Sequence, residues 1–140
     1  MKKRVLGLIL VPFLLFSALI PERFVNAEKE EHAWQDEIIY FIMIDRFNNG
    51  DTSNDFEVDR NDPKAYHGGD FKGITQKLDY IHEMGFTAIW LTPIVKNEPG
   101  GYHGYWAEDF YETEEHFGTI GDFKELVNEA HERDIKVIVD

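Results

Sequence analysis

The residues of this sequence that could bind a metal ion gather in and around one polar stretch, residues 48–69. Carboxylates, side-chain amides and backbone carbonyls lie within a short reach there, and hard cations such as calcium take roughly six to eight oxygen ligands of these kinds. The stretch lacks the EF-hand order of alternating Asp and Asn residues, a Gly and a final Glu. An ordinary solvated turn cluster has the same composition, so the spacing suggests calcium without establishing it. The residues concerned are Asp45, Asn48, Asn49, Asp51, Asn54, Asp55, Gly68 and Asp70.

A second chemical signal is a histidine among aromatic residues, in the sequence Tyr-His-Gly-Tyr-Trp. Sugar rings have an apolar C–H face and a rim of hydroxyls, so Tyr105 and Trp106 suit stacking on a sugar while His103 hydrogen-bonds to it. The two aromatic residues also suit the core of a packed loop, which is the commoner role of such side chains. Glu108 and Asp109 are adjacent carboxylates, but neighbours in an extended segment point to opposite sides, which excludes them as a catalytic pair.

Composition excludes several other classes of protein and site. The chain has 14 basic and 27 acidic residues and a formal net charge of −13, which argues against a nucleic-acid binder. It has no cysteine, which rules out disulfide scaffolds and thiolate zinc sites. The histidines have no His-Glu-x-x-His spacing, and neither a Gly-x-Ser-x-Gly elbow nor a phosphate-binding glycine loop occurs.

Three short apolar runs predict three strands, at residues 38–44, 86–91 and 135–139. The first run is continuous and rich in β-branched and aromatic residues, which is typical of a strand buried on both faces of a parallel sheet. Long loops, residues 48–69 and 92–117, follow the first two strands and need a reason to be ordered. Such loops lie at the carboxyl ends of parallel strands, where α/β folds place their sites.

Two helices alternate with these strands and complete the prediction of an α/β fold built from βαβ units. The first begins at Asp70, a suitable N-cap, and ends at Gly85, which suits the left-handed conformation after a helix. The second begins after Thr119, which with Asp122 has the spacing of a capping box. The apolar positions that would face the sheet are Ile74, Leu78 and Ile81 in the first helix, and Phe123, Leu126, Val127 and Ala130 in the second.

Residues 1–27 are expected to be a signal peptide. The segment has a basic start, an apolar run from Val5 to Ile20 and a small-x-Ala sequence that ends at Ala27. The apolar run of 16 residues is short for a membrane span of about 20. We therefore expect a secreted, extracellular protein that starts at Glu28 and has no membrane attachment after cleavage.

Six motifs follow one another in register over nearly all of residues 37–140. They are Asp45-Arg46-Phe47, His67-Gly68-Gly69-Asp70, Ala88-Ile89-Trp90-Leu91-Thr92-Pro93, Tyr102-His103-Gly104-Tyr105-Trp106, Phe117-Gly118-Thr119 and Ile135-Lys136-Val137-Ile138-Val139-Asp140. In this order they resemble the α-amylase family of glycoside hydrolases, and most closely its secreted bacterial α-amylases and cyclodextrin glucanotransferases.

The resemblance implies a role for each candidate residue. His103, Tyr105 and Trp106 match residues that line the sugar sites around the cleaved bond. Asp140 matches the aspartate that opens the first conserved region of the family. The oxygen ligands of the family's first calcium site fall on Asn49, Asp51, Asn54, Asp55, Gly68 (through its carbonyl) and Asp70, with some carboxylates and amides exchanged relative to familiar members.

The resemblance also implies a TIM (β/α)8 barrel, of which residues 28–140 would be the amino-terminal part, about three βα units long. A small domain would follow the third strand. The nucleophilic Asp, the acid/base Glu and the Asp that stabilises the transition state would lie at the ends of strands four, five and seven, beyond Asp140. No catalytic residue is then expected in this chain, and the fragment by itself should be inactive.

Three functions remain open from the sequence. The first is part of a secreted, calcium-dependent, retaining hydrolase of α-1,4-glucosidic bonds in starch or maltodextrin, with α-glucan polysaccharides or oligosaccharides as partners. The second is a transglycosylase of the cyclodextrin glucanotransferase type. The third is a carbohydrate-binding protein without catalysis on the same scaffold, because a fold does not fix a function.

Overall fold

The computed structural model describes residues 34–140, and the predicted signal segment lies outside them. Within these residues the parallel sheet has the strand order β1-β2-β5, with bounds Ile39–Ile42, Ala88–Leu91 and Lys136–Val139. A separate antiparallel pair consists of β3 (Val95–Asn97) and β4 (Ala107–Thr113). The predicted α/β class and the parallel pairing are therefore confirmed.

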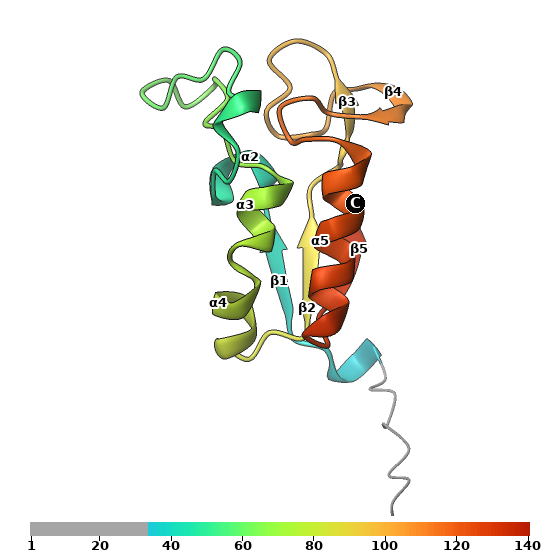
Figure 1. Cartoon of the computed structure of the whole chain (residues 1–140). Coiled ribbons are helices and arrows are strands. Elements are labelled where there is room, and N and C mark those ends of the chain that lie inside the picture. Colours follow the sequence, from blue (N-terminus) through green and yellow to red (C-terminus); the bar gives the residue numbers. More distant parts are fainter. Residues whose placement is uncertain (1–33) are drawn as a thin grey trace, which may run out of the picture. The chain divides into compact units, whose positions relative to one another are not determined.

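The helices of the described residues are short except for the last one. None of them is long and apolar enough to cross a bilayer. Figure 1 shows α3, α4 and α5 together over one side of the parallel sheet. The helical elements are η2 (Trp34–Asp36), α2 (Ile44–Phe47), η3 (Thr52–Asn54), α3 (Phe71–Thr75), α4 (Leu78–Glu83) and α5 (Ile120–Glu132).

The single helix predicted from Asp70 to Gly85 is two helices, α3 and α4. The break lies at Gln76 and Lys77, where the Lys77 N–H bonds to the Ile74 carbonyl three residues back and tightens the turn. The predicted cap is correct, because the Asp70 carboxylate accepts the Gly73 N–H at 2.6 Å. Gly85 also has the expected left-handed conformation, with φ of +86°.

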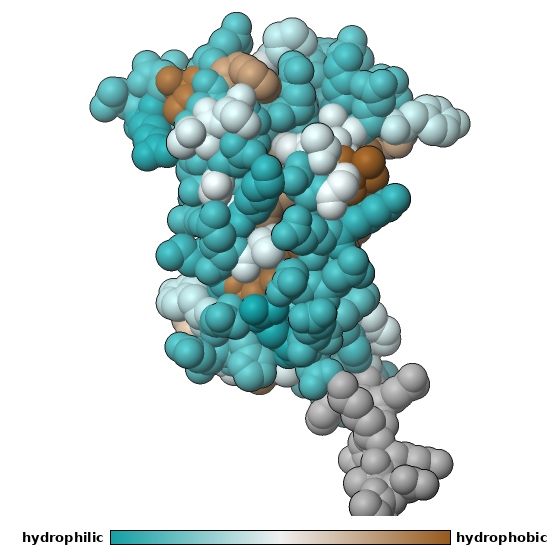
Figure 2. All heavy atoms as spheres, viewed as in Figure 1, coloured by the Kyte–Doolittle hydropathy of each residue, from teal (hydrophilic) through white to brown (hydrophobic). Residues whose placement is uncertain are grey.

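The core lies between the helices and one face of the sheet. The predicted positions Ile74, Leu78 and Ile81 are fully buried there, and they share one cluster with strand residues such as Ile42 and Leu91. Thr119 and Asp122 form both hydrogen bonds of the predicted capping box at the start of α5. The outer side of these helices is mainly hydrophilic, as the matching view in Figure 2 shows. Amphipathic helices thus cover this face of the sheet and expose polar residues to water.

The opposite face of the sheet is exposed, so the prediction that the first strand is buried on both faces is wrong for the described residues. Phe41 and Trp90 are register partners, and their rings meet edge to face at 5.2 Å. They are 48% and 39% exposed, and neighbouring Ile39 is also exposed. The helices α3, α4 and α5 cover one face only, and in residues 34–140 the part of the other face around Phe41 and Trp90 stays open.

Strands β3 and β4 lie in the segment predicted to be a loop, residues 92–117. Strand β4 reads Ala-Glu-Asp-Phe-Tyr-Glu-Thr and is exposed along most of its length, so it lacks the apolar alternation that reveals a half-buried strand. Its register with the three residues of β3 contains irregularities. The hairpin therefore forms through pairing of β3 with β4 across the segment between them. The sequence of β4 has no local apolar pattern that predicts a strand.

We expect residues 28–140 alone to lack a cooperative unfolding transition and to bind a hydrophobic fluorescent dye, because the face around Phe41 and Trp90 stays in contact with water. Calorimetry and dye fluorescence would measure this. Phe41→Ser should reduce dye binding, whereas Tyr111→Ser, which removes an exposed ring on β4, should not. A sharp unfolding transition without dye binding would contradict the expectation.

Candidate functional site

The two long loops that carry the candidate residues lie at the same end of the parallel sheet, beyond the carboxyl ends of β1 and β2 (Figure 1). The first loop, residues 48–69, is folded back on its own start by Asp45. The buried Asp45 carboxylate accepts the N–H groups of His67 and Gly68, at 2.8 and 3.1 Å. Its backbone carbonyl accepts the Gly69 N–H at 2.9 Å. Burial raises the pKa of Asp45, although these N–H groups oppose the shift.

Asp70 likewise holds the loop with its carboxylate, through backbone N–H groups near the start of the loop. Its buried carboxylate accepts the N–H groups of Gly50 and Asp51, at 3.0 and 2.8 Å, besides capping α3. Burial raises the pKa of Asp70 as well. The chain is tightly packed here, since a Cβ atom on Gly73 would lie 1.8 Å from the Asn48 carbonyl oxygen. Backbone contacts therefore hold the loop against α3 where apolar burial is scarce.

Four of the predicted calcium ligands lie close together or are buried in the first loop, which Asp45 and Asp70 hold in place. The Asn49 amide nitrogen donates to both oxygens of Asp55, at 2.7 and 2.9 Å. Gly68 faces the same pair, because a Cβ atom on it would lie 2.5 Å from an Asp55 oxygen. The side-chain oxygens of Asn49 and Asn54 are buried and have no hydrogen-bond donor among the described residues. Buried oxygens normally have a partner, so these two fit the donor set of a hard cation.

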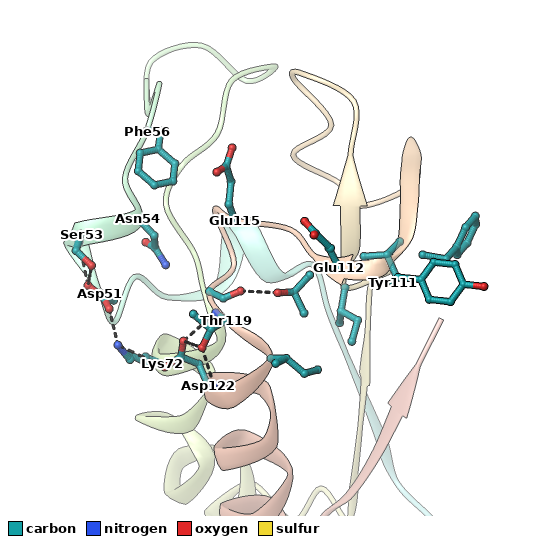
Figure 3. Close-up of a pocket in the computed structure, with 16 residues that line it drawn as sticks. Asp51, Ser53, Asn54, Phe56, Lys72, Tyr111, Glu112, Glu115, Thr119 and Asp122 are labelled. Carbon is teal, nitrogen blue, oxygen red and sulfur yellow. Dashed lines mark hydrogen bonds and ion pairs between the residues drawn. The ribbon is translucent and has the colours of Figure 1, made fainter.

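Asp51 is turned toward a different partner. Its carboxylate accepts the Ser53 N–H and hydroxyl and pairs with the Lys72 ammonium at 2.5 Å. The Lys72 hydrogen bond, aided by Ser53, lowers the pKa of Asp51. Figure 3 shows Lys72 between Asp51 and Asp122, to which Lys72 is also paired, at 3.4 Å. Lys72 thus supplies a positive charge beside Asp51, a contact that sequence spacing did not indicate.

A pocket of about 720 Å³ lies beside this ion pair (Figure 3). Lys72, Asp51 and Asp122 line one side of it, and Tyr111 and Glu112 of β4 line another. The aromatic residues predicted to bind sugar do not line this pocket.

Within residues 34–140 no group of three or more His, Asp and Glu side chains is placed to hold a metal ion. A cation in the first loop would therefore need amide oxygens and a backbone carbonyl as ligands besides carboxylates.

A buried cluster after β4 supports the first loop from the other side. The rings of Tyr66 and His116 stack at 3.6 Å, and the Glu114 carboxylate lies 2.5 Å from one nitrogen of His116. The other nitrogen of His116 lies 3.1 Å from the Phe56 carbonyl oxygen. Glu114 also accepts the Asn97 N–H at 2.8 Å. The cluster joins both loops, and only its Glu-x-His spacing is visible in the sequence.

Two competing effects act on Glu114. Burial pushes its pKa upward, but the hydrogen bonds from His116 and Asn97 outweigh burial, so the pKa of Glu114 is lowered overall. The charged carboxylate is therefore the stable form in the folded protein.

The second loop brings its three candidate residues together. The Tyr105 N–H donates to a ring nitrogen of His103 at 3.0 Å. The His103 ring lies near-parallel to Tyr105 at 6.0 Å and edge-on to Trp106 at 4.8 Å. Tyr105 and Trp106 are 51% and 53% exposed, so in the described residues they are surface aromatics and not the core of a packed loop. An exposed aromatic pair beside an imidazole can stack on an apolar sugar face and hydrogen-bond to its hydroxyls.

The end of β5 fixes one member of this group. The Tyr105 hydroxyl donates to the Asp140 carboxylate at 2.6 Å. This hydrogen bond is the main reason that the pKa of Tyr105 is raised, so the phenol stays protonated. The contact joins the second loop to the residue that directly follows the third parallel strand.

Comparison with known proteins gives a consistent result. Residues 41–140 match the family described as alpha amylase, catalytic domain. Over 112 residues the chain is 51% identical to the beta/alpha-amylase of Paenibacillus polymyxa, covering 76% of this chain and 9% of that protein. The structure of an Anoxybacillus α-amylase is 74% identical with a TM-score of 0.78, covering 79% of this chain and 24% of that one. The α-amylase of Geobacillus thermoleovorans, solved in complex with acarbose, is 69% identical with a TM-score of 0.72, covering 79% and 23%.

The chain thus spans about a quarter or less of the length of these relatives. The predicted family is confirmed by this match, and the sheet of residues 34–140 is a part of the TIM barrel without its closure.

We expect Glu114→Gln to destabilise the full-length protein by about 1–3 kcal/mol near neutral pH, because it removes a charged partner of a buried hydrogen-bond network. The pKa of Glu114 is lowered on folding, so its contribution is present above the ordinary value of 4.5 and is lost as the pH falls through the lowered value. Urea unfolding over a pH series should show the two proteins converging in acid. Glu115→Gln, which alters the exposed neighbour, is the control, and an equal effect of both variants at every pH would contradict the assignment.

Proposed function

Because the chain belongs to the α-amylase family of glycoside hydrolases, we propose that residues 28–140 are the amino-terminal part of a secreted, calcium-dependent enzyme. The enzyme hydrolyses α-1,4-glucosidic bonds of starch and maltodextrins with retention of configuration. The observation that supports this proposal best is the exposed pair Tyr105 and Trp106 beside the half-buried His103, at the carboxyl end of the sheet. Active sites of TIM barrels lie at this end.

The residues of the second loop bind substrate and do not perform the bond cleavage. A retaining glycosidase needs one carboxylate as nucleophile and one carboxylic acid that protonates the leaving oxygen, about 5 Å apart across the bond. Glu108 and Asp109 are successive residues of β4, and successive residues of a strand face opposite sides. We propose that the catalytic carboxylates belong to later strands of the barrel. The chain alone is then inactive.

Calcium in this proposal binds to the first loop and organises it. The proposed ligands with the most support are the amide oxygens of Asn49 and Asn54, which are buried without a donor. The Asp55 carboxylate and the Gly68 carbonyl are added to them because Gly68 lies against Asp55 and Asn49. Asp51 and Asp70 complete the proposed set. The Asp51 carboxylate is shared with Lys72, and both oxygens of Asp70 already accept backbone N–H groups. When bound, the ion supplies positive charge that offsets carboxylate repulsion and ties the two ends of the loop together.

Secretion in this proposal depends on residues 1–27, which are removed as a signal peptide so that the enzyme acts outside the cell. The acidic composition suits this, because a net charge far from zero favours solubility. The partner is an α-glucan polysaccharide or oligosaccharide, without nucleic acid and without a membrane anchor after cleavage.

We expect Tyr105→Ala and Trp106→Ala each to weaken catalysis by the full-length enzyme, by about 1–3 kcal/mol in kcat/KM, because each removes an aromatic surface on which a sugar stacks. Steady-state kinetics on maltoheptaose would measure the loss, and analysis of the anomeric form of the products would test retention. Tyr111→Ala is the matched control, because that ring lies on β4, is 98% exposed and is not among the rings that His103 contacts, which are Tyr102, Tyr105 and Trp106. Wild-type kinetics in both test variants would exclude these aromatic residues from substrate binding.

We expect a calcium chelator to lower the melting temperature of the full-length protein. A ligand that binds only the folded state stabilises it by about 3 kcal/mol at a concentration a hundredfold above its Kd. Asn54→Ala and Asp55→Ala should reduce the difference between chelated and calcium-loaded protein, as measured by calorimetry.

Asp59→Ala is the matched control for the calcium experiment. Asp59 lies in the same loop, is exposed and bonds only locally, to the Asn61 N–H and through its backbone. It should leave the chelator response unchanged. Asp70→Ala is a poorer test, because it also removes the cap of α3. A wild-type chelator response in both the Asn54 and the Asp55 variants would show that the loop is only a solvated turn cluster.

A further inference from the structure

Arg46 lies in α2, the short helix that follows β1, and its guanidinium group holds the far part of the first loop. One terminal nitrogen donates to the Ala65 carbonyl at 3.0 Å, and the other donates to the Pro63 carbonyl at 2.8 Å. The first of these nitrogens also pairs with the Asp45 carboxylate at 2.9 Å. These contacts use the planar fork of the guanidinium group, which a lysine ammonium does not reproduce.

The flat face of the same group meets the second loop. The central carbon of the Arg46 guanidinium lies 4.1 Å from the centre of the Tyr102 ring, which is the geometry of a cation–π contact. The Tyr102 ring in turn meets the ring of His103 edge to face at 5.0 Å. A continuous line of contacts therefore runs from the first loop through Arg46 and Tyr102 to His103.

Two features distinguish Arg46 as the residue that links the first loop to Tyr102. Its side chain is only 22% exposed, and a cation–π contact is stronger when water is partly excluded. Arg60 also donates to a carbonyl of the first loop, that of His67, but the guanidinium group that lies over the Tyr102 ring is that of Arg46. The two arginines thus differ in the link to the second loop while sharing the link to the first.

We propose that Arg46 is a positioning residue that couples the first loop to the substrate loop by holding Tyr102 against His103. The inference deepens the proposed function and rests on it. Order in residues 63–65 fixes the guanidinium group, the guanidinium group fixes the Tyr102 ring, and that ring limits where the His103 imidazole can lie. His103 is proposed to contact the sugar beside the cleaved bond. Loss of the coupling should therefore mainly reduce the stabilisation of the transition state.

The test is a double-mutant cycle in the full-length enzyme with Arg46→Met and Tyr102→Leu. Each single variant should lower kcat/KM on maltoheptaose by about threefold to thirtyfold, the range expected for a partly buried cation–π contact. The loss should lie mainly in kcat, with KM nearly unchanged, as for an interaction made in the transition state. The double variant should lose no more than the worse single variant.

Three variants serve as controls. Tyr102→Phe keeps the ring and should behave nearly as the wild type. Arg60→Met removes a first-loop contact of the same kind and should leave kcat unchanged. Arg46→Lys keeps the charge but loses the fork, so it should retain the fold while reproducing part of the loss. Losses that multiply in the double variant, or that occur equally in Arg60→Met, would overturn the proposal.

A second measurement tests the proposed coupling and does not depend on enzyme activity. In protein with isotope-labelled histidines, the NMR signals of the His103 ring, identified by their absence in His103→Gln, should move in Arg46→Met and Tyr102→Leu and stay in place in Arg60→Met. Unmoved His103 signals would overturn the coupling. If instead the signals move but the wild-type protein has no activity on α-glucans, the positioning role holds and the proposed function fails.

Discussion

The structure depends on two buried carboxylates that satisfy the backbone of a long polar loop. Asp45 and Asp70 accept N–H groups from residues about 20 positions away, at the two ends of residues 48–69. Burial raises the pKa of both groups, so their charge has an energetic cost that the hydrogen bonds must offset. A loop with little apolar burial cannot otherwise repay its ordering entropy.

The framework of hydrogen bonds around Asp45 and Asp70 positions the oxygen donors at the carboxyl end of the sheet. It leaves the side-chain oxygens of Asn49 and Asn54 buried without a donor and places Gly68 against Asp55, and the proposed calcium ion would use oxygens of these kinds. The framework is then joined to the second loop at two places, the Arg46–Tyr102 contact and the Glu114–His116 cluster. The proposed metal site and the proposed sugar site are therefore parts of one connected structure.

The parallel sheet supports both loops and is itself unfinished in these residues. Its helix-covered face has a continuous core, whereas the face with Phe41 and Trp90 is open to water. In the barrel of the α-amylase family this face points to the interior, where layers of side chains from alternate strands fill the space. The exposed face agrees with a chain that spans about a quarter or less of its relatives, and it explains why we expect the segment alone to fold poorly.

The sequence by itself determined the features that depend on residues close together in the chain. The Asp70 cap, the Thr119–Asp122 capping box and the three strand-forming runs could be predicted, because each depends on side chains acting on their own backbone or on a local apolar run. The ordered motifs likewise identified the family. Only the tertiary structure decided that β3 and β4 pair, that Asp51 turns to Lys72, and that Arg46 reaches Tyr102. These contacts join residues separated by roughly 10 to 60 positions, and their partners are selected by packing and charge in the folded chain, which leave no periodic trace in the sequence.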